Sequence, residues 1–544
     1  MGTCKPLAGI RNKACLAVYA AMVAVALAMI WGQRFVPMQD YPIWLSEGDV
    51  LSRLLRGTAE DNFGIVPYPV PNAASTAIIG LLAVIMNVEI AGKVFLSLAV
   101  IVFAVGAYWL TSPAPGRRRN AFSLMPLALM AGFPFFHGNI NYFLGLGLLM
   151  LAGGYLVRRA DTGGSVQFLP MLALSAAMFF AHALALGAWV VLLAAYLADR
   201  RRRGRWSVAA LAHLPVAVLL ASYLLGRAIY PMVSLYGPAP PAGSTSLWVK
   251  NKVTELLYYL CPFGQFHAFQ TGPWPVALAA ANGACLLVLA VVAVASAWRS
   301  LAGGQDRWLL GACVVYVLAW MAAPLYLGGV SSPGQRMVLP GALVALALAA
   351  RQAWGDRTRA VAMAWAAGLL IFTAGYLLVY VGGVSAGVTD CYARLQRLDP
   401  PGDCVFVDEG LFRFQDRLPA CRRQTIWRKA LLGDHSVLGR LGYYLSVERG
   451  SGGAVFGTSI LRARRHPAVP RTLAEVRKAA PERLILLGCD EGNALIAEDL
   501  SENYRIRLRE ANIVVLERIH YRAVSAASGS ALETGSSCRV PSAP

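Results

Sequence analysis

The sequence predicts a polytopic α-helical membrane protein of about 11 transmembrane helices with a small α/β domain near its C-terminus. Hydrophobic residues make up 57% of the 544 residues and charged residues 14%, and the mean hydropathy is +0.53. That composition lies outside the range of soluble globular proteins. Apolar runs of about 20 residues, long enough to cross a bilayer core, recur as far as Tyr380. We therefore expect a transmembrane domain over 1–383, a soluble domain over 384–524 and a disordered tail over 525–544.

The first span, Ala14–Trp31, follows Arg11 and Lys13, which predicts a cytoplasmic N-terminus. The sidedness of later segments depends on whether the apolar stretch Ala73–Val88 crosses the membrane. If it does not cross, 18 of the 26 basic residues before Gly383 lie in the cytoplasm, whereas only 8 do so if it crosses. The positive-inside rule favours the first case. We therefore predict a juxtamembrane helix over 73–88 at the outer surface.

The other spans follow from the remaining apolar runs, and they place the soluble domain outside the cytoplasm. The run Ser165–Leu197 is too long for one helix, and a turn at His182 would divide it into two short spans. The remaining spans are Ala91–Leu110, Ala121–Phe135, Tyr142–Val157, Ser207–Ala228, Pro275–Trp298, Trp308–Leu327, Met337–Ala350 and Val361–Tyr380.

The soluble domain alternates stretches that are typical of strands and helices. Asp403–Val407, Arg483–Leu487 and Ile513–Leu516 predict short buried strands, and Thr472–Ala480 predicts a helix. There is no glycine-rich nucleotide-binding motif. The arginine clusters lie directly between hydrophobic segments, so we expect membrane lipids and no nucleic acid as their partners.

The first external loop, Gly32–Asn72, gathers acidic residues that are rare elsewhere in the transmembrane domain. It holds five of the 11 acids before position 383, and these are Asp40, Glu47, Asp49, Glu60 and Asp61. Asp40 lies closest to the first span, where a carboxylate could serve as a general base or a metal ligand. Alternatively, Asp40 caps a short helix, because proline favours early helix positions and Pro42 follows.

Three further groups of polar residues fall on the predicted external face. His137, Asn139 and Asn141 in PFFHGNINY could bind a phosphate or a sugar, or satisfy the backbone of a tight turn. Arg336 at the mouth of a span suits an anionic partner such as a lipid phosphate, the alternative being snorkelling to the headgroups. Lys250 and Lys252 follow a flexible stretch, YGPAPPAGSTS, that could act as a lid. His182 more often marks a packing residue than a ligand.

The chain resembles the GT-C superfamily of membrane glycosyltransferases, which includes the protein O-mannosyltransferases and the aminoarabinose transferase of lipid A. The resemblance rests on MQDYP at Met38–Pro42, on the juxtamembrane stretch and on the layout of spans. It implies transfer of a hexose or pentose from a polyprenyl-phosphate donor to an external lipid, glycan or protein, with inversion. It also implies a bacterial inner membrane, and Asp40 as the general base.

The same resemblance implies other site residues. Arg336 with Lys250 or Lys252 would hold the leaving phosphate, and the lipid tail would lie between spans. Tyr41, Glu47 and Asp49 are further candidates for substrate binding. Tyr41 stands where many members have a second acid, and the second external loop offers His137, Asn139 and Asn141 in place of an acid. These differences leave open whether the site uses a divalent cation, Mg²⁺ or Mn²⁺.

Two other functions fit a protein of this composition. A transporter or lipid flippase would show internal repeats and ionisable residues buried within its spans. The chain has no evident repeat, and its spans are almost free of such residues. A membrane-anchored assembly factor would need only the external domain.

Overall fold

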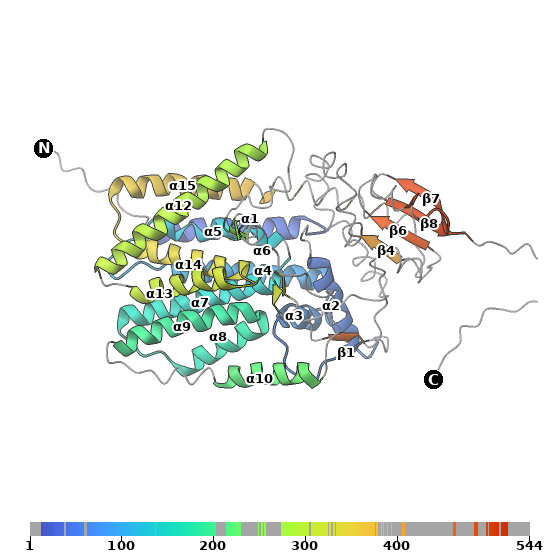
Figure 1. Ribbon diagram of the computed structural model, residues 1–544, viewed down its shortest axis with the longest axis horizontal. Coiled ribbons are helices and arrows are strands. Elements are labelled where there is room, and N and C mark those ends of the chain that lie inside the picture. Colours follow the sequence, from blue (N-terminus) through green and yellow to red (C-terminus); the bar gives the residue numbers. More distant parts are fainter. Residues whose placement is uncertain are drawn as a thin grey trace, which may run out of the picture.

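The structure is a computed structural model (Figure 1). His137, Lys250, Glu60, Asp61, the predicted helix Thr472–Ala480 and the tail 525–544 lie outside the described residues. The structure describes residues 12–36, 38, 40–58, 63–136, 138–202, 214–229, 249, 252–253, 255–256, 260, 274–303, 306–324, 326–327, 330–331, 333–375, 377–378, 382, 385, 389, 393, 405–408, 461–463, 483–487, 497–498, 500–510 and 513–519.

The described residues form mainly a bundle of helices, as the sequence predicts. Six of these helices, α1, α4, α7, α9, α12 and α15, are long and apolar enough to cross a membrane, which indicates a membrane protein. The helices are α1 (Asn12–Gly32), α2 (Tyr41–Leu55), α3 (Ala74–Ala83), α4 (Val88–Leu110), η1 (Ala121–Ser123), α5 (Pro126–Leu129), α6 (Phe133–Phe136), α7 (Ile140–Thr162), α8 (Phe168–Ala181), α9 (Ala183–Arg202), α10 (Leu214–Ile229), α12 (Trp274–Gly303), α13 (Arg307–Ala322), α14 (Gln335–Arg351) and α15 (Asp356–Gly375).

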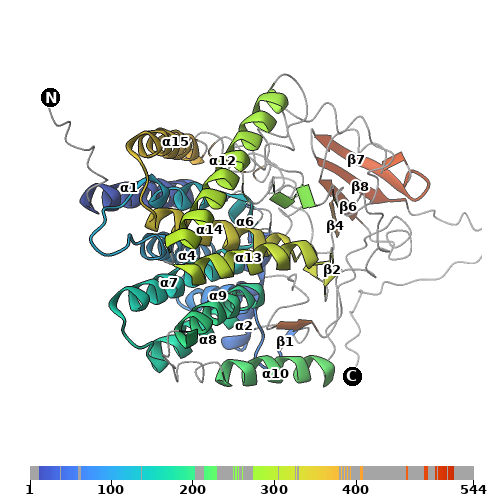
Figure 2. The ribbon, with the colours of Figure 1, turned by 60° about the vertical axis from the view of Figure 1, so that its left-hand side comes forward.

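The two ends of the bundle differ in what covers them. We call one end the Asp40 end, because α2, α3 and β1 lie there, where α1 ends and α4, α7, α9 and α14 begin (Figures 1 and 2). The other is the Arg351 end, where α7, α9 and α14 end. Helix α3 has only 10 residues, which at about 1.5 Å per residue is too short to cross a bilayer core.

Helices α4 and α7 run parallel and touch through their backbones. A Cβ added at Gly106 would lie 2.4 Å from the Gly147 carbonyl oxygen, and one at Gly147 would lie 2.8 Å from the Phe103 amide. Farther along, Gly154 packs in the same way against Leu110. Small residues at such positions allow the close approach that stabilises membrane helix pairs.

Between α4 and α7 in the sequence, the chain returns to the Asp40 end through the buried passage 121–136. It starts beside Asn120, whose side-chain amide donates to carbonyls at the end of α14, and it finishes beside Asp40. The prediction of one continuous helix over Ala121–Phe135 is wrong, because the passage consists of η1, α5 and α6 joined by turns. Pro126 and Pro134 lack the amide hydrogen that a continuous helix needs. Residues 121–132 are all buried, which irregular backbone at membrane depth requires.

The predicted break at His182 is confirmed. Helix α8 ends at Ala181 and α9 begins at Ala183, with an extended backbone at His182 (φ −166°, ψ 126°). The imidazole Nδ1 accepts a hydrogen bond from the Leu184 amide (3.1 Å), which satisfies one of the free amides at the start of α9.

A small sheet near the C-terminus confirms the predicted strands. It contains β4 (Val405–Asp408), β6 (Arg483–Leu487), β8 (Ile513–Arg518) and β7 (Tyr504–Glu510) in that order, with β4 parallel to β6 and the other pairs antiparallel. A separate strand, β5 (Leu461–Ala463), pairs with β1 (Phe63–Ile65) of the first loop. Strands β2 (Tyr326–Leu327) and β3 (Val330–Ser331) form a hairpin before α14.

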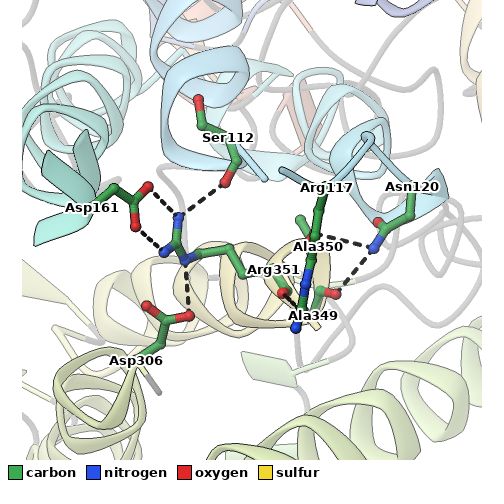
Figure 3. A network of polar contacts seen from close by, with 8 residues as sticks. All are labelled: Ser112, Arg117, Asn120, Asp161, Asp306, Ala349, Ala350 and Arg351. Carbon is green, nitrogen blue, oxygen red and sulfur yellow. Dashed lines mark hydrogen bonds and ion pairs between the residues drawn. The ribbon is translucent and has the colours of Figure 1, made fainter. Parts of the chain in front are cut away.

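A network of charged side chains joins helix ends at the Arg351 end (Figure 3). The buried guanidinium of Arg351 pairs with Asp161 at the end of α7 and with Asp306 before α13, the latter at 2.9 Å. Arg117 donates to the Arg351 carbonyl (2.8 Å), which would otherwise lack a partner at the end of α14. These contacts fix the ends of three helices relative to one another.

Candidate functional site

Helix α2 places Asp40 at the Asp40 end of the bundle. The helix begins at Tyr41, with Pro42 in its first turn, and the Asp40 carbonyl accepts from the Ile43 amide (3.1 Å). Asp40 therefore occupies the N-cap position, although its carboxylate does not form the usual capping hydrogen bond. The residue is half-buried. The alternative prediction, that Asp40 caps a helix, is therefore correct for the position of the residue but not for its side chain.

Gly138 brings the loop before α7 against Asp40. It has φ +80°, and a Cβ added there would lie 2.5 Å from the Asp40 amide nitrogen and 2.8 Å from that of Tyr41. Trp44 of α2 donates from its indole nitrogen to the Gly138 carbonyl (2.9 Å). The chain from α6 into α7 thus lies directly on the start of α2, and no larger residue fits at position 138 without displacing Asp40.

Asn141 and Asn72 tie three helix starts together. The Asn141 side chain accepts from the Ser75 amide (2.8 Å) at the start of α3 and donates to the Asn72 carbonyl (2.6 Å). Asn72, with φ 69°, accepts from the Ala183 amide (3.3 Å) at the start of α9. The oxygen and the nitrogen of the Asn141 side chain thus both form hydrogen bonds with backbone atoms. This agrees with the alternative prediction that the residue satisfies the backbone of a turn.

Arg336 reaches the same region from α14. The Tyr142 hydroxyl in α7 donates to the Arg336 carbonyl (2.7 Å), and the Tyr142 ring meets the His182 ring edge-on at 5.0 Å between centroids. Burial, and then the charge of Arg336, lower the pKa of His182 well below its usual value. Arg336 and His182 are therefore neighbours, although 154 positions separate them in the sequence.

Helix starts make this region favourable for an anion. The contacts of Gly138, Asn141, Asn72 and Tyr142 bring together the N-termini of α2, α3, α7, α9 and α14. Each N-terminus carries a partial positive charge from the aligned peptide dipoles. Together with the Arg336 guanidinium, they give the region a positive potential that suits a phosphate.

Glu47, Asp49 and Tyr41 of the first loop point elsewhere. Glu47 is fully buried and accepts from the Thr76 hydroxyl of α3, and Asp49 pairs with Arg53 (2.9 Å) within α2. Burial raises the pKa of Asp49, and Arg53 opposes that rise. Tyr41 is buried with its hydroxyl against Gly92 of α4. Among the described residues, no three His, Cys, Asp or Glu side chains gather in a way that could hold a metal ion.

Lys252 lies close to Arg336 but is fully engaged. Its ammonium is 3.1 Å from Glu255, 2.8 Å from the Trp320 carbonyl and 3.2 Å from the Ala323 carbonyl, at the end of α13. An ammonium has three N–H donors, so these partners use all of them. A Cβ added at Gly334 would lie 2.8 Å from Lys252 Nζ, which places this ion pair beside the start of α14.

A small apolar crevice lies deeper in the bundle, between α5, α12, α14 and α15. Its lining includes Met125, Leu260, Leu289, Leu346 and Trp365. Leu346 is ten positions after Arg336 on α14, which places the crevice about 15 Å deeper at 1.5 Å per residue. Its volume is only about 20 Å³, which is room for about one water molecule.

The structure thus brings Asp40, Asn139, Asn141 and Arg336 to the first turn of α7, where Asn139 precedes the helix. Asn72 and Tyr142 were not predicted from the sequence, and His182 was predicted to be a packing residue. The proline-rich stretch VPYPVPN, which ends at Asn72, was the available signal for this residue, because asparagine is common where φ is positive. Comparisons with models of protein families, with curated proteins and with solved structures find no match to this chain.

Proposed function

We propose that this protein is an integral membrane glycosyltransferase that transfers a sugar from a polyprenyl-phosphate donor to an acceptor outside the cytoplasm. The proposal depends on one observation, the approach of Asp40 and Arg336 to the same helix turn. Asp40 meets it through Gly138 and Arg336 meets it through Tyr142. A carboxylate and a guanidinium around one electropositive region are the two groups that this transfer needs.

In the proposed reaction, the Asp40 carboxylate takes the proton of an acceptor hydroxyl while the hydroxyl oxygen attacks the anomeric carbon. The bond from that carbon to the phosphate oxygen breaks, and the configuration is inverted. The polyprenyl phosphate leaves with its negative charge held by Arg336. Its tail would lie between spans. Lys252 would support the start of α14 through its contact with Gly334.

The proposed orientation places the Asp40 end and the C-terminal sheet outside the cytoplasm of a bacterial inner membrane, with eleven crossings. Its support is the distribution of arginine. Helix α7 ends with Arg158 and Arg159, and α9 ends with Arg200–Arg202, all at the Arg351 end. Positively charged residues favour the cytoplasmic side of a membrane protein.

The test is sugar transfer by purified protein in lipid nanodiscs supplied with radiolabelled polyprenyl-phosphate sugars and membrane-derived acceptors. Asp40→Asn should lower the rate by about 10²–10⁴-fold, the usual contribution of a general base. Asp49→Asn is the matched control on the same helix, because Asp49 pairs with Arg53, and it should keep most of the activity. Transfer at the wild-type rate by Asp40→Asn would remove Asp40 as the base.

A further inference from the structure

Two hydrogen-bond donors belong to residues that both contact Tyr142 at the Asp40 end, and neither donor has an acceptor among the described residues. The Arg336 guanidinium forms no ion pair with any described acid, and its Nε is buried without a partner. His182 is only 8% exposed, and its one hydrogen bond within the described part of the chain uses Nδ1. Its Nε2 has no hydrogen-bond partner among the described residues. A buried donor without an acceptor costs about 1–3 kcal/mol, so the buried Arg336 Nε needs an explanation.

The local contacts of His182 determine which nitrogen carries the proton. Nδ1 accepts the Leu184 amide hydrogen (3.1 Å), so in the neutral ring the hydrogen is on Nε2. Burial and the nearby Arg336 charge keep the pKa of His182 low, which favours that neutral ring. The edge-on contact with Tyr142 fixes the ring plane. His182 therefore presents an uncharged N–H next to a permanent cation.

Three acids at this end of the bundle are engaged elsewhere. Asp49 pairs with Arg53, Glu47 accepts from Thr76, and Glu255 pairs with Lys252. The acceptor for the two donors is thus none of these carboxylates. The helix starts around them add positive potential, which selects an anion over a neutral acceptor.

We propose that His182 Nε2 and the Arg336 guanidinium bind the same phosphate group. An arginine fork engages two oxygens of a phosphate, and a third oxygen is then left for the imidazole N–H. That the phosphate belongs to a lipid rests on the proposed function. His182 is then a binding residue for the phosphate, in addition to satisfying the start of α9.

Two substitutions separate these roles. His182→Asn keeps an acceptor near Nδ1 for the Leu184 amide but removes the Nε2 donor. His182→Gln keeps a donor near Nε2 and removes that acceptor. Binding of farnesyl phosphate, a short water-soluble polyprenyl phosphate, is measured on the full chain in nanodiscs of uncharged lipid. We expect His182→Asn to bind about tenfold more weakly than wild type, and His182→Gln to bind within about threefold.

The opposite order, with wild-type affinity in His182→Asn and weak binding in His182→Gln, would overturn the proposal and leave His182 as a helix cap only. Inorganic phosphate is titrated in parallel. If it binds with the same dependence on position 182 and farnesyl phosphate does not bind, the site stands and takes free phosphate.

A measurement on the unmutated chain guards against variants that fail to fold. With ¹⁵N-labelled histidine, farnesyl phosphate should shift the Nε2 resonance of one of the seven histidines, and uncharged farnesol should not. No shift with either ligand would contradict the proposal. The site and the transferase activity fail separately. If His182→Asn binds weakly while Asp40→Asn transfers sugar at the full rate, the phosphate site stands and Asp40 is not the base. If His182→Asn binds like wild type while Asp40→Asn is inactive, Asp40 stands as the base and the phosphate site does not.

Discussion

At the scale of single residues, Gly138 decides how closely the loop before α7 approaches Asp40. Its positive φ and its contact with the Asp40 amide are separate constraints. The positive φ would strain any other L-residue at this position, and an added side chain would push Asp40 away from its position. Gly116 has nearly the same φ, +76°, but nothing within 4 Å of an added Cβ.

This difference gives a matched pair of substitutions. Gly138→Ala should reduce sugar transfer at least about tenfold, because displacing a reacting group by about 1 Å can cost far more than that. Gly116→Ala, which suffers only the strain of positive φ, should stay near the wild-type rate. Transfer rate and thermal stability are measured together for both variants. Equal losses in the two would mean that backbone strain, and not the contact with Asp40, matters.

The sequence predicted the residue types of the site better than their roles. Asp40 and Arg336 were expected from charge on the external face, and the structure brings them to one helix turn. Lys252 shows the limit, because its three partners come from the end of α13 and a nearby glutamate. Only tertiary packing tells a saturated lysine from one that can bind a ligand.

At the scale of elements, α4 and α7 depend on glycine for their packing. Gly147 lies against the backbone of Phe103, whereas Gly187 of α9 has open space around it. Alanine is about 1 kcal/mol better than glycine within a helix when nothing else changes. The two positions should therefore respond in opposite directions to the same substitution.

We expect Gly147→Ala to lower the thermal unfolding temperature in detergent, because the added methyl group would separate two helix backbones. Gly187→Ala should leave that temperature unchanged or raise it. The comparison uses unfolding followed by size-exclusion chromatography after heating. A Gly147→Ala protein as stable as wild type would show that the helix pair has room to adjust.

Element boundaries followed from apolar runs where each run forms one regular helix, as in α4 and α7. The same reasoning failed at the buried passage 121–136, whose composition is as apolar as that of a span. Pro126 and Pro134 were the available signal. Hydropathy alone does not show that neighbouring helices enclose an irregular backbone.

At the scale of the whole molecule, the Arg351 network joins helices that are far apart in the sequence. Arg351 is 4% exposed and holds two carboxylates, Asp161 and Asp306. Removing it leaves two acids without their cation, and breaking such a buried pair costs about 3–5 kcal/mol. Arg359 and Asp356 form an exposed pair at the same end, at 3.7 Å, and such pairs contribute about 0–1 kcal/mol.

Arg351→Gln should therefore unfold at a clearly lower temperature than wild type, and Arg359→Gln should not. Adding Asp161→Asn and Asp306→Asn to Arg351→Gln should recover part of the loss, since it removes the unpaired charges. Thermal unfolding of all variants in the same detergent is the measurement. Similar unfolding temperatures for Arg351→Gln and Arg359→Gln would show that the network contributes no more than a surface pair.

The buried passage 121–136 also has a consequence for how the chain enters the membrane during synthesis. A segment with unpaired backbone groups is poorly solvated by lipid alone. Asn120 makes its contacts with Ala349 and Ala350, more than 200 positions later in translation. This passage therefore lacks its contacts with α14 until that helix has been made. The start of this passage can reach its final position only after the ribosome has made α14.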